Sequence, residues 1–376
     1  MRAGSDARAP AVDAPCVDVI VPTIGASPHL EACLDAVLGQ QGVGLSVLLV
    51  EQRRAHGRVP DCVRRLESSG RGFAAAANAG LAATDAPLVA LVNDDAVVAE
   101  GWLAALAAAL VADPGLAAVQ GAHLLGVADA AAPGAAGAPA DGIGDGVGGA
   151  AAGAALVAAG ETTRRLDGVG LAFNRWWQAV QIGHGLPASA LAAAVEAEAP
   201  DRGRTFEVFG VSATAALYRR RDLARAALGR GREAAMGFDE SLESYYEDVE
   251  LACRLRACGR RSAWVRGAAV EHAGSASEHA SPGPSRERLV LRNRLLVLAR
   301  LLGRRFPLAL PRILARDLID GARGGGGGLA MAAAAWCGAL RRLPAFAHLG
   351  PPRVPISTLR GLGAERANDT LIGNRK

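Results

Sequence analysis

Asn93-Asp94-Asp95 carries side chains suited to binding a metal ion. The motif directly follows Pro87–Val92, a run without any polar residue. Two adjacent carboxylates at the end of a buried strand repel each other unless a cation lies between them or solvent screens them. Their oxygens suit Mg²⁺ or Mn²⁺, which leave coordination positions open for phosphate oxygens. An ordinary turn with Asx hydrogen bonds is the alternative interpretation.

A second acidic motif, Glu247-Asp248, begins a segment with helical periodicity, Glu247–Ala257. Acidic residues stabilise the first turn of a helix, so simple capping is one interpretation. A general base held at a helix N-terminus and facing the strand ends is the other. His272 follows 24 residues after Asp248. A lone histidine is usually a packed or surface side chain, and it becomes a candidate metal ligand only beside the aspartates.

Alternating strands and helices must position these motifs. Short apolar runs predict strands, and 3.6-residue periodicity predicts helices. We expect strands at Val17–Thr23, Leu45–Val50, Pro87–Val92 and Ala117–Gln120, with helices at His29–Gln40, Asp61–Glu67, Ala74–Ala83 and Trp102–Val111. This order predicts an α/β fold with a doubly wound, mostly parallel sheet flanked by helices. Ligands of such folds bind at the carboxyl ends of the strands.

The second half of the chain continues with a strand at Ser262–Val265, a short strand ending at His272 and a helix at Arg286–Leu302. We therefore expect a flexible leader at 1–16, an α/β domain at 17–283 and a helical C-terminal extension at 284–376. Within the domain, 126–160 is a low-complexity Ala/Gly/Asp/Pro stretch that cannot pack a core, and we expect a surface loop there.

Composition excludes several classes. The chain has 376 residues, 51% of them hydrophobic and 21% charged, which excludes wholesale disorder and a collagen repeat. The six cysteines form no CxxC pair, which favours a reducing compartment and argues against a zinc site. The N-terminus has no apolar signal region, and no apolar run reaches 18 residues. We expect a cytoplasmic protein.

The formal charge of +4 is unevenly distributed. Residues 284–376 carry 17 basic and 5 acidic side chains, or +12, whereas the rest of the chain carries −8. Within the basic part, 286–316 combines leucines with arginines, among them Arg288, Arg292, Arg294, Arg300, Arg304 and Arg305. It suits peripheral contact with the anionic inner face of the plasma membrane. Contact with a partner helix and a solvated tail are the alternatives. Pro307 and Pro311 must break or kink this helix. The acidic body and the absence of a basic aromatic motif argue against nucleic-acid binding.

The motifs together resemble inverting glycosyltransferases of family 2, closest to the rhamnosyltransferase-like branch that builds polysaccharides of the bacterial cell envelope. The resemblance rests on VIVPT in the first strand, GFAAAANAG at 72–80, LVNDD, GFDESLESYYEDVELACRLRACG and AAVEHAGSAS, with Arg292-Asn293-Arg294 beyond. Each piece is weak alone, but five occur in the family's order across about 260 residues.

This resemblance implies a GT-A fold, a divalent cation (Mg²⁺ or Mn²⁺), a dTDP- or UDP-sugar donor and a glycan or lipid-linked acceptor. It implies Asp248 as the catalytic base with Glu247 beside it. Asp95 would coordinate the cation and His272 would complete the metal site. The nucleotide-sugar side would be formed by Pro22, Thr23, Glu51, Gly72, Phe73, Asn78 and Asp94, and the donor-sugar and acceptor region by Gly210, Val211 and Ser212.

Two features depart from the family pattern. Glu51 stands where the family usually has an aspartate, and Gly70 stands where an asparagine is common. The adjacent Trp176 and Trp177 are candidates for stacking on a sugar ring or an acceptor lipid, with core packing as the alternative.

Two other classes of function compete with this interpretation. A Rossmann-type oxidoreductase is disfavoured because no GxGxxG follows the first strand. A non-catalytic glycan- or nucleotide-binding module is disfavoured because Asp95, Asp248 and His272 are all present.

Overall fold

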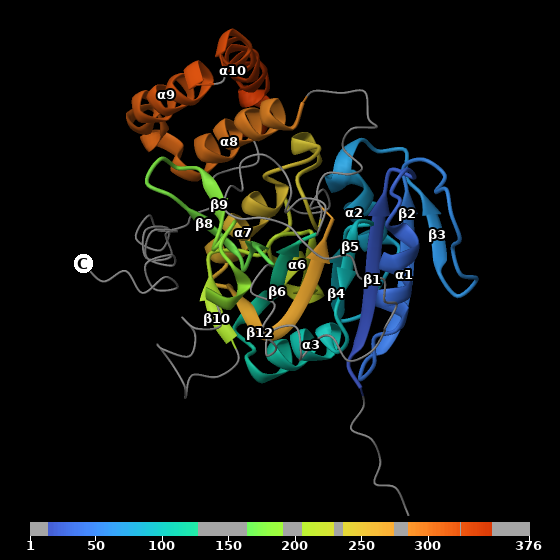
Figure 1. Ribbon diagram of the computed structural model, residues 1–376. Coiled ribbons are helices and arrows are strands. Elements are labelled where there is room, and N and C mark those ends of the chain that lie inside the picture. The colour runs from blue at the N-terminus through green and yellow to red at the C-terminus, as the bar shows by residue number, and fades with distance from the viewer. Residues whose placement is uncertain are drawn as a thin grey trace, which may run out of the picture.

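The computed structural model describes residues 14–126, 164–190, 205–228, 236–273, 285–323 and 325–347. Most of the expected leader and of the 126–160 loop lies outside these ranges, as do residues 348–376. The described chain forms a ten-stranded mixed sheet with helices on both faces and a two-stranded sheet beside it (Figure 1). The predicted α/β fold with a mostly parallel sheet is confirmed.

The strands are β1 (Cys16–Thr23), β2 (Gly44–Glu51), β3 (Arg64–Glu67), β4 (Leu88–Val92), β5 (Ala96–Val98), β6 (Leu116–Leu125), β7 (Leu166–Gly168), β8 (Leu171–Phe173), β9 (Ala179–Gln181), β10 (Thr205–Val208), β11 (Ala215–Arg219) and β12 (Arg261–His272). The α-helices are α1 (Leu30–Leu38), α2 (Gly72–Ala82), α3 (Trp102–Ala112), α6 (Arg220–Arg225), α7 (Glu247–Ala257), α8 (Arg286–Leu302), α9 (Phe306–Arg323) and α10 (Gly325–Ala347).

The main sheet has the order β10-β12-β6-β11-β4-β1-β2-β3. Strands β1, β2, β3 and β4 are parallel, as are β6 and β12, while β11 runs antiparallel between β4 and β6. Alternate side chains of β1 enter two separate cores because strand residues alternate between faces. Ile20 packs with α2 on one face, and Val19 packs with α1 and α3 on the other. Because β1, β2, β3 and β4 run in the same direction, their carboxyl ends meet at one edge of the sheet.

The prediction of a helix at Asp61–Glu67 is wrong. Residues Arg64–Glu67 form the edge strand β3, which pairs in parallel with β2. The segment offers only Val63 and Leu66 to the core, too little apolar surface for a helix, and the free edge of β2 supplies hydrogen bonds instead. The two strands expected between Ser262 and His272 are one strand, β12, with an irregularity between Trp264 and Ala269.

The C-terminal helices gather next to α7, at the end of the molecule toward which the parallel strands point (Figure 1). Helix α8 ends at Leu302, and a 3-10 turn at Gly303–Arg305 leads into α9, so the predicted break lies just before Pro307. Pro311, by contrast, lies inside α9 and does not end that helix. Leucines of α8 share a third apolar core with α7 and β8. No helix within the described ranges is long and apolar enough to span a membrane.

Candidate active site

Asp94 and Asp95 lie at the carboxyl end of β4, both almost fully buried. The Thr23 hydroxyl, at the end of neighbouring β1, donates to Asp94 Oδ2 at 2.5 Å. Burial raises the pKa of Asp94 to about 6; the Thr23 hydrogen bond opposes this rise, and the charge of Asp95 adds to it. The predicted pair of carboxylates is therefore a buried acidic corner at the edge of the sheet.

His272 lies beside this corner because β5 pairs antiparallel with the end of β12, opposite residue Ala96. Its Nε2 lies 3.4 Å from Asp95 Oδ1, and its Nδ1 lies 3.1 Å from Asp167 Oδ2. Burial lowers the pKa of His272, but the carboxylates of Asp167 and Asp95 outweigh that effect and raise it to about 10. The structure brings together the two side chains predicted as metal ligands.

The donor set at this corner fits a hard divalent cation. Asp95 Oδ1 and Asn93 Oδ1 are buried and have no hydrogen-bond partner among the described residues. A carboxylate holds the far nitrogen of His272, the arrangement that orients histidines that bind metals. Across the ranges that the structure describes, no three His, Cys, Asp or Glu side chains form a complete metal cage. A cation held by Asp95 and His272 would therefore keep coordination positions open for phosphate oxygens and water.

Asp167 is a site residue that the sequence did not reveal. It lies in the three-residue strand β7, 105 positions before His272, and no motif marks it. Its carboxylate also lies 3.3 Å from Nδ1 of the exposed His184. Although burial raises the pKa of Asp167, its hydrogen bonds with the two histidines lower it far below the ordinary range. The only nearby sequence feature that could have pointed to Asp167 is the Gly183-His184-Gly185 turn, whose histidine contacts it.

Glu247 and Asp248 form the first turn of α7, as predicted. The amide of Val249 donates to Asp248 Oδ1 at 2.7 Å, and the amide of Ala213 lies 3.4 Å from Oδ2. The neighbouring Thr214 carbonyl accepts a hydrogen bond from the Asn93 amide at 2.8 Å. Both acidic motifs therefore border the same 213–214 segment.

Burial sets the protonation of this pair. It raises the pKa of Asp248 to about 6, against the hydrogen bonds from the amides of Val249 and Ala213. Burial and the charge of Asp248 raise the pKa of Glu247 well above its ordinary value. Asp248 is consequently ionised at neutral pH but more basic than an exposed aspartate, as a general base requires.

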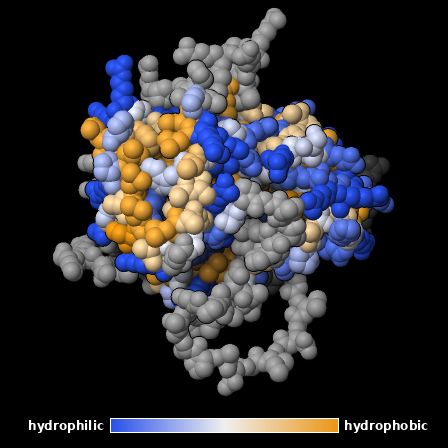
Figure 2. All heavy atoms as spheres, turned by 90° about the horizontal axis from the view of Figure 1, so that it is seen from above, coloured by the Kyte–Doolittle hydropathy of each residue, from blue (hydrophilic) through white to orange (hydrophobic). Residues whose placement is uncertain are grey.

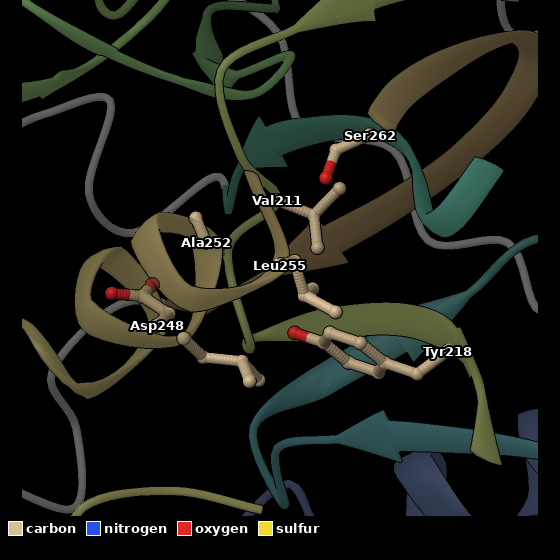
Figure 3. Close-up of a pocket in the computed structure, with 7 residues that line it drawn as sticks. Val211, Tyr218, Asp248, Ala252, Leu255 and Ser262 are labelled. Atoms are coloured by element: carbon tan, nitrogen blue, oxygen red, sulfur yellow. The ribbon is translucent and has the colours of Figure 1, made fainter. Parts of the chain in front are cut away.

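A narrow gap without room for a water molecule lies under α7, between that helix and the sheet. Figure 3 shows Leu255, Val211 and the Tyr218 ring filling its centre, while the Asp248 carboxylate points away from them. This space is a packing gap of the core, and the Asp248 carboxylate lies on the other side of the helix turn.

The expected nucleotide residues divide into two groups. Pro22 and Thr23 end β1 beside Asp94, at the strand edge. Glu51 is buried, and both of its oxygens bind Arg65 while one also accepts from the Ala55 amide. The Arg65 hydrogen bond lowers the pKa of Glu51 against the effect of burial. Glu51 therefore shapes the loop after β2 from inside.

Gly72, Phe73 and Asn78 lie on α2 and contact the chain before α7. The Asn78 side chain accepts from the Phe238 amide at 2.8 Å and donates to the Phe238 carbonyl at 2.9 Å. The Phe73 and Phe238 rings meet edge to face, 5.6 Å apart. These residues join α2 to the loop that precedes α7.

Gly210, Val211 and Ser212 form the buried connection between β10 and β11, and a side chain at 210 would meet Ala252 Cβ at 2.4 Å. This packing places the connection directly against α7. The Ser212 amide donates to the Gln120 side chain at 2.8 Å.

The two tryptophans differ in environment. Trp177 packs against Phe173 and the third apolar core. Trp176 is half-buried, with the guanidinium groups of Arg312 and Arg316 lying 4.9 and 5.8 Å from its ring centre. Both side chains are half-buried, and Trp176 is the one that contacts arginines of α9.

Comparison with known proteins agrees with this architecture. Residues 18–124 match glycosyl transferase family 2. The structure of GalNAc-T7 with UDP, GalNAc and Mn²⁺ superposes with a TM-score of 0.52 at 11% identity, over 78% of this chain and 49% of that one. This chain thus spans about half the length of that protein. No curated protein sequence matches the chain significantly.

Two further solved structures are similar at lower TM-scores. The mannosyltransferase PcManGT from Pyrobaculum calidifontis, in complex with GDP-Man and Mn²⁺, gives 0.43 at 17% identity, over 96% of this chain and 88% of that one. S. aureus TarS 1-349 gives 0.46 at 15% identity, over 95% and 88%. The family match spans β1 to β6 and includes Asp94 and Asp95. The chain therefore contains a segment, residues 18–124, that is similar to glycosyl transferase family 2, within a fold of the GT-A type.

Proposed function

We propose that the chain is an inverting glycosyltransferase that moves a sugar from a nucleoside diphosphate donor to a hydroxyl of a glycan or lipid-linked acceptor. The observation that carries the proposal is the position of Asp248. Its carboxylate lies at the N-terminus of α7, against the 213–214 segment that also binds the end of β4. The base and the acidic corner therefore border one site.

The chemistry follows from these positions. Asp248 accepts the proton of the acceptor hydroxyl as that oxygen forms its bond to the anomeric carbon. The bond from the anomeric carbon to the diphosphate breaks on the opposite face, and the electron pair leaves with the diphosphate. One displacement inverts the anomeric configuration. Burial and the charge of Asp248 raise the pKa of Glu247, which disfavours a second negative charge beside Asp248.

Asp95 and His272 would hold a divalent cation, which would neutralise charge on the leaving diphosphate when bound. The GalNAc-T7 structure, which shares this fold, contains UDP and Mn²⁺ and supports a cation and a nucleotide donor here. Asp167 would orient His272 from behind. Pro22, Thr23 and Asp94 would border the nucleotide at the strand ends, and Trp176 is the candidate for acceptor stacking.

We also propose peripheral contact with an anionic membrane, at the inner face of the plasma membrane, through α9 and α10. Three of the arginines expected to face the membrane are buried in α8: Arg292, Arg294 and Arg300. Their predicted role at the membrane is therefore wrong. Five large apolar side chains are instead exposed on the next two helices: Leu308, Leu318, Ile319, Leu329 and Leu340.

The chemistry of this face suits such a membrane. Figure 2 shows apolar side chains gathered on one side of the face that these helices form, bordered by hydrophilic ones. The exposed arginines of the same region include Arg304, Arg305 and Arg341. Apolar side chains with an arginine border are the combination that binds anionic leaflets.

Replacing Asp248 with Asn tests the base. Asp248→Asn preserves the shape but removes the basic oxygen, so kcat for sugar transfer falls by roughly 10²–10⁴-fold with donor affinity unchanged. The donor is first chosen from UDP- and dTDP-sugars by thermal shift with Mn²⁺; transfer is then followed by chromatography and binding by calorimetry. Asp35→Asn, an exposed site on α1, is the control. Near-normal turnover of Asp248→Asn contradicts the assignment.

The same variant tests how much the buried charge of Asp248 lowers the free energy of unfolding. The pKa of Asp248 is about 6 in the folded state and lower in the unfolded chain. Between roughly pH 4 and 6 the folded state therefore binds the extra proton, and the free energy of unfolding falls as pH rises. Asp248→Asn removes this loss, so urea unfolding at pH 7.5 shows it to be more stable than wild type by about 1–3 kcal/mol. An unchanged or lower stability at pH 7.5 contradicts the burial argument.

The cation site is tested by Mn²⁺ binding, followed by electron paramagnetic resonance in the presence of UDP or dTDP. Asp95→Asn and His272→Ala each remove a ligand and weaken binding strongly. Asp167→Asn weakens it by roughly 10–100-fold, because His272 loses its orienting partner. Asp35→Asn, at an exposed carboxylate on α1, leaves binding unchanged. Equal affinity in all four variants excludes this site.

Membrane contact is tested by co-sedimentation with vesicles. The protein sediments with vesicles that contain phosphatidylglycerol and less with pure phosphatidylcholine, and salt weakens the binding. The double variant L308E/I319E loses roughly tenfold in binding. V111E, at an equally exposed apolar side chain on α3, does not. The proposal is ruled out if the wild-type protein does not bind anionic vesicles. It is also ruled out if the protein forms a dimer that L308E/I319E dissociates.

A further inference from the structure

The segment that leads into Glu247-Asp248 follows an unusual path. Glu243, Tyr245 and Tyr246 have φ angles of 65°, 68° and 69°, in the left-handed region that residues with a Cβ rarely occupy. Within the described chain the only other such residue is Trp177. Strain of this kind persists only where surrounding contacts impose it. The side chain whose contacts impose this backbone path therefore determines where α7 begins.

The carbonyl groups of this segment converge on one buried amide from α8. Asn293 Nδ2 lies 2.8 Å from the Leu242 carbonyl oxygen, 2.9 Å from that of Ser244 and 2.7 Å from that of Tyr245. The side chain of Asn293 is fully buried. Its Oδ1 accepts from Nε of the preceding Arg292 at 2.8 Å, which fixes the orientation of the amide.

Arg292 adds two contacts to the same segment. Its Nη2 donates to the Leu242 carbonyl at 3.0 Å, and its Nη1 lies 3.3 Å from the Glu243 carboxylate. Arg342 of α10 binds the same carboxylate at 2.8 Å. The segment 242–246 is therefore held from one side by the C-terminal helices.

The opposite side of the segment contacts the start of α2. The Ala74 amide donates to the Glu243 carbonyl at 2.9 Å, and the Phe73 amide donates to Ser244 Oγ at 3.0 Å. A Cβ at Gly72 would lie 2.6 Å from the Glu243 carbonyl, so the two backbones touch. One segment thus joins α8, the start of α2 and the helix turn that carries Asp248.

We propose that Asn293 is a positioning residue that holds 242–246 in its left-handed path and thereby sets the place of Asp248 relative to the start of α2. Only an amide does this, because its N–H groups satisfy the carbonyls while its oxygen binds Arg292. An aspartate of the same shape would set a carboxylate against three carbonyl oxygens. The catalytic part of the inference rests on the proposed function, whereas the structural part stands without it.

Hydrogen exchange of the full-length protein tests the structural part. In Asn293→Ala and Asn293→Asp, amides in 241–250 and 72–78 exchange roughly tenfold or more faster, and those of β1 and β2 do not change. Leu298→Ala, a fully buried apolar position on the same helix, is the control. It lowers the melting temperature and leaves both segments protected.

Kinetics tests the catalytic part at a temperature where every variant is folded. Both Asn293 variants lose roughly tenfold or more in kcat per folded molecule, because a small displacement of the base costs rate. Leu298→Ala retains its kcat. Exchange in 241–250 that is unchanged in the Asn293 variants, or equally fast in Leu298→Ala, overturns the proposal. Absence of sugar transfer in the wild-type protein refutes the proposed function, and exchange still decides the role of Asn293.

Discussion

Burial of negative charge at the carboxyl edge of the sheet is the constraint on which this structure depends. Asp94, Asp95 and Glu247 are nearly inaccessible to solvent, and Asp248 follows Glu247 in the first turn of α7. Burial raises the pKa of Asp94 and Asp248 to about 6 because only a few donors face each carboxylate. Such an arrangement costs stability and suits ligands that bring positive charge or donate a proton to a carboxylate.

Stability for this edge comes from the C-terminal helices. Arg300 of α8 reaches Asp239 at 2.8 Å and also binds Glu250 of α7. Glu250 is bound in turn by Arg254 at 2.7 Å, and all four side chains are buried. Removing one member of such a network would leave an unpaired buried charge. The basic C-terminal part is therefore an integral support of α7, and its charge serves the interior as well as the surface.

The sequence predicted the local elements well, because apolar periodicity and helix signals are local properties. The bounds of α7 and α8 match the structure, and the acidic motifs lie where strand and helix ends were expected. The edge strand β3 was missed because these residues become a strand by pairing with β2, and their own apolar pattern does not predict a strand. Glu51 was assigned to the nucleotide from its position, whereas Arg65 binds both of its oxygens.

Contacts between distant segments were beyond the reach of sequence patterns. Asp167 meets His272 across 105 positions, and Asn293 meets the 242–245 carbonyls across about 50. Neither residue type is unusual in its own element. Only the folded backbone shows that Asp167 supports a candidate ligand and that Asn293 contacts the loop before α7.

The anomeric configuration of the product tests the account most directly. Proton NMR of the freshly formed glycoside, compared with the donor, reports whether the sugar was transferred with inversion. A single displacement assisted by Asp248 predicts the opposite anomeric configuration to that of the donor. A product that retains the donor configuration would contradict the role of Asp248 as a base and require a different mechanism.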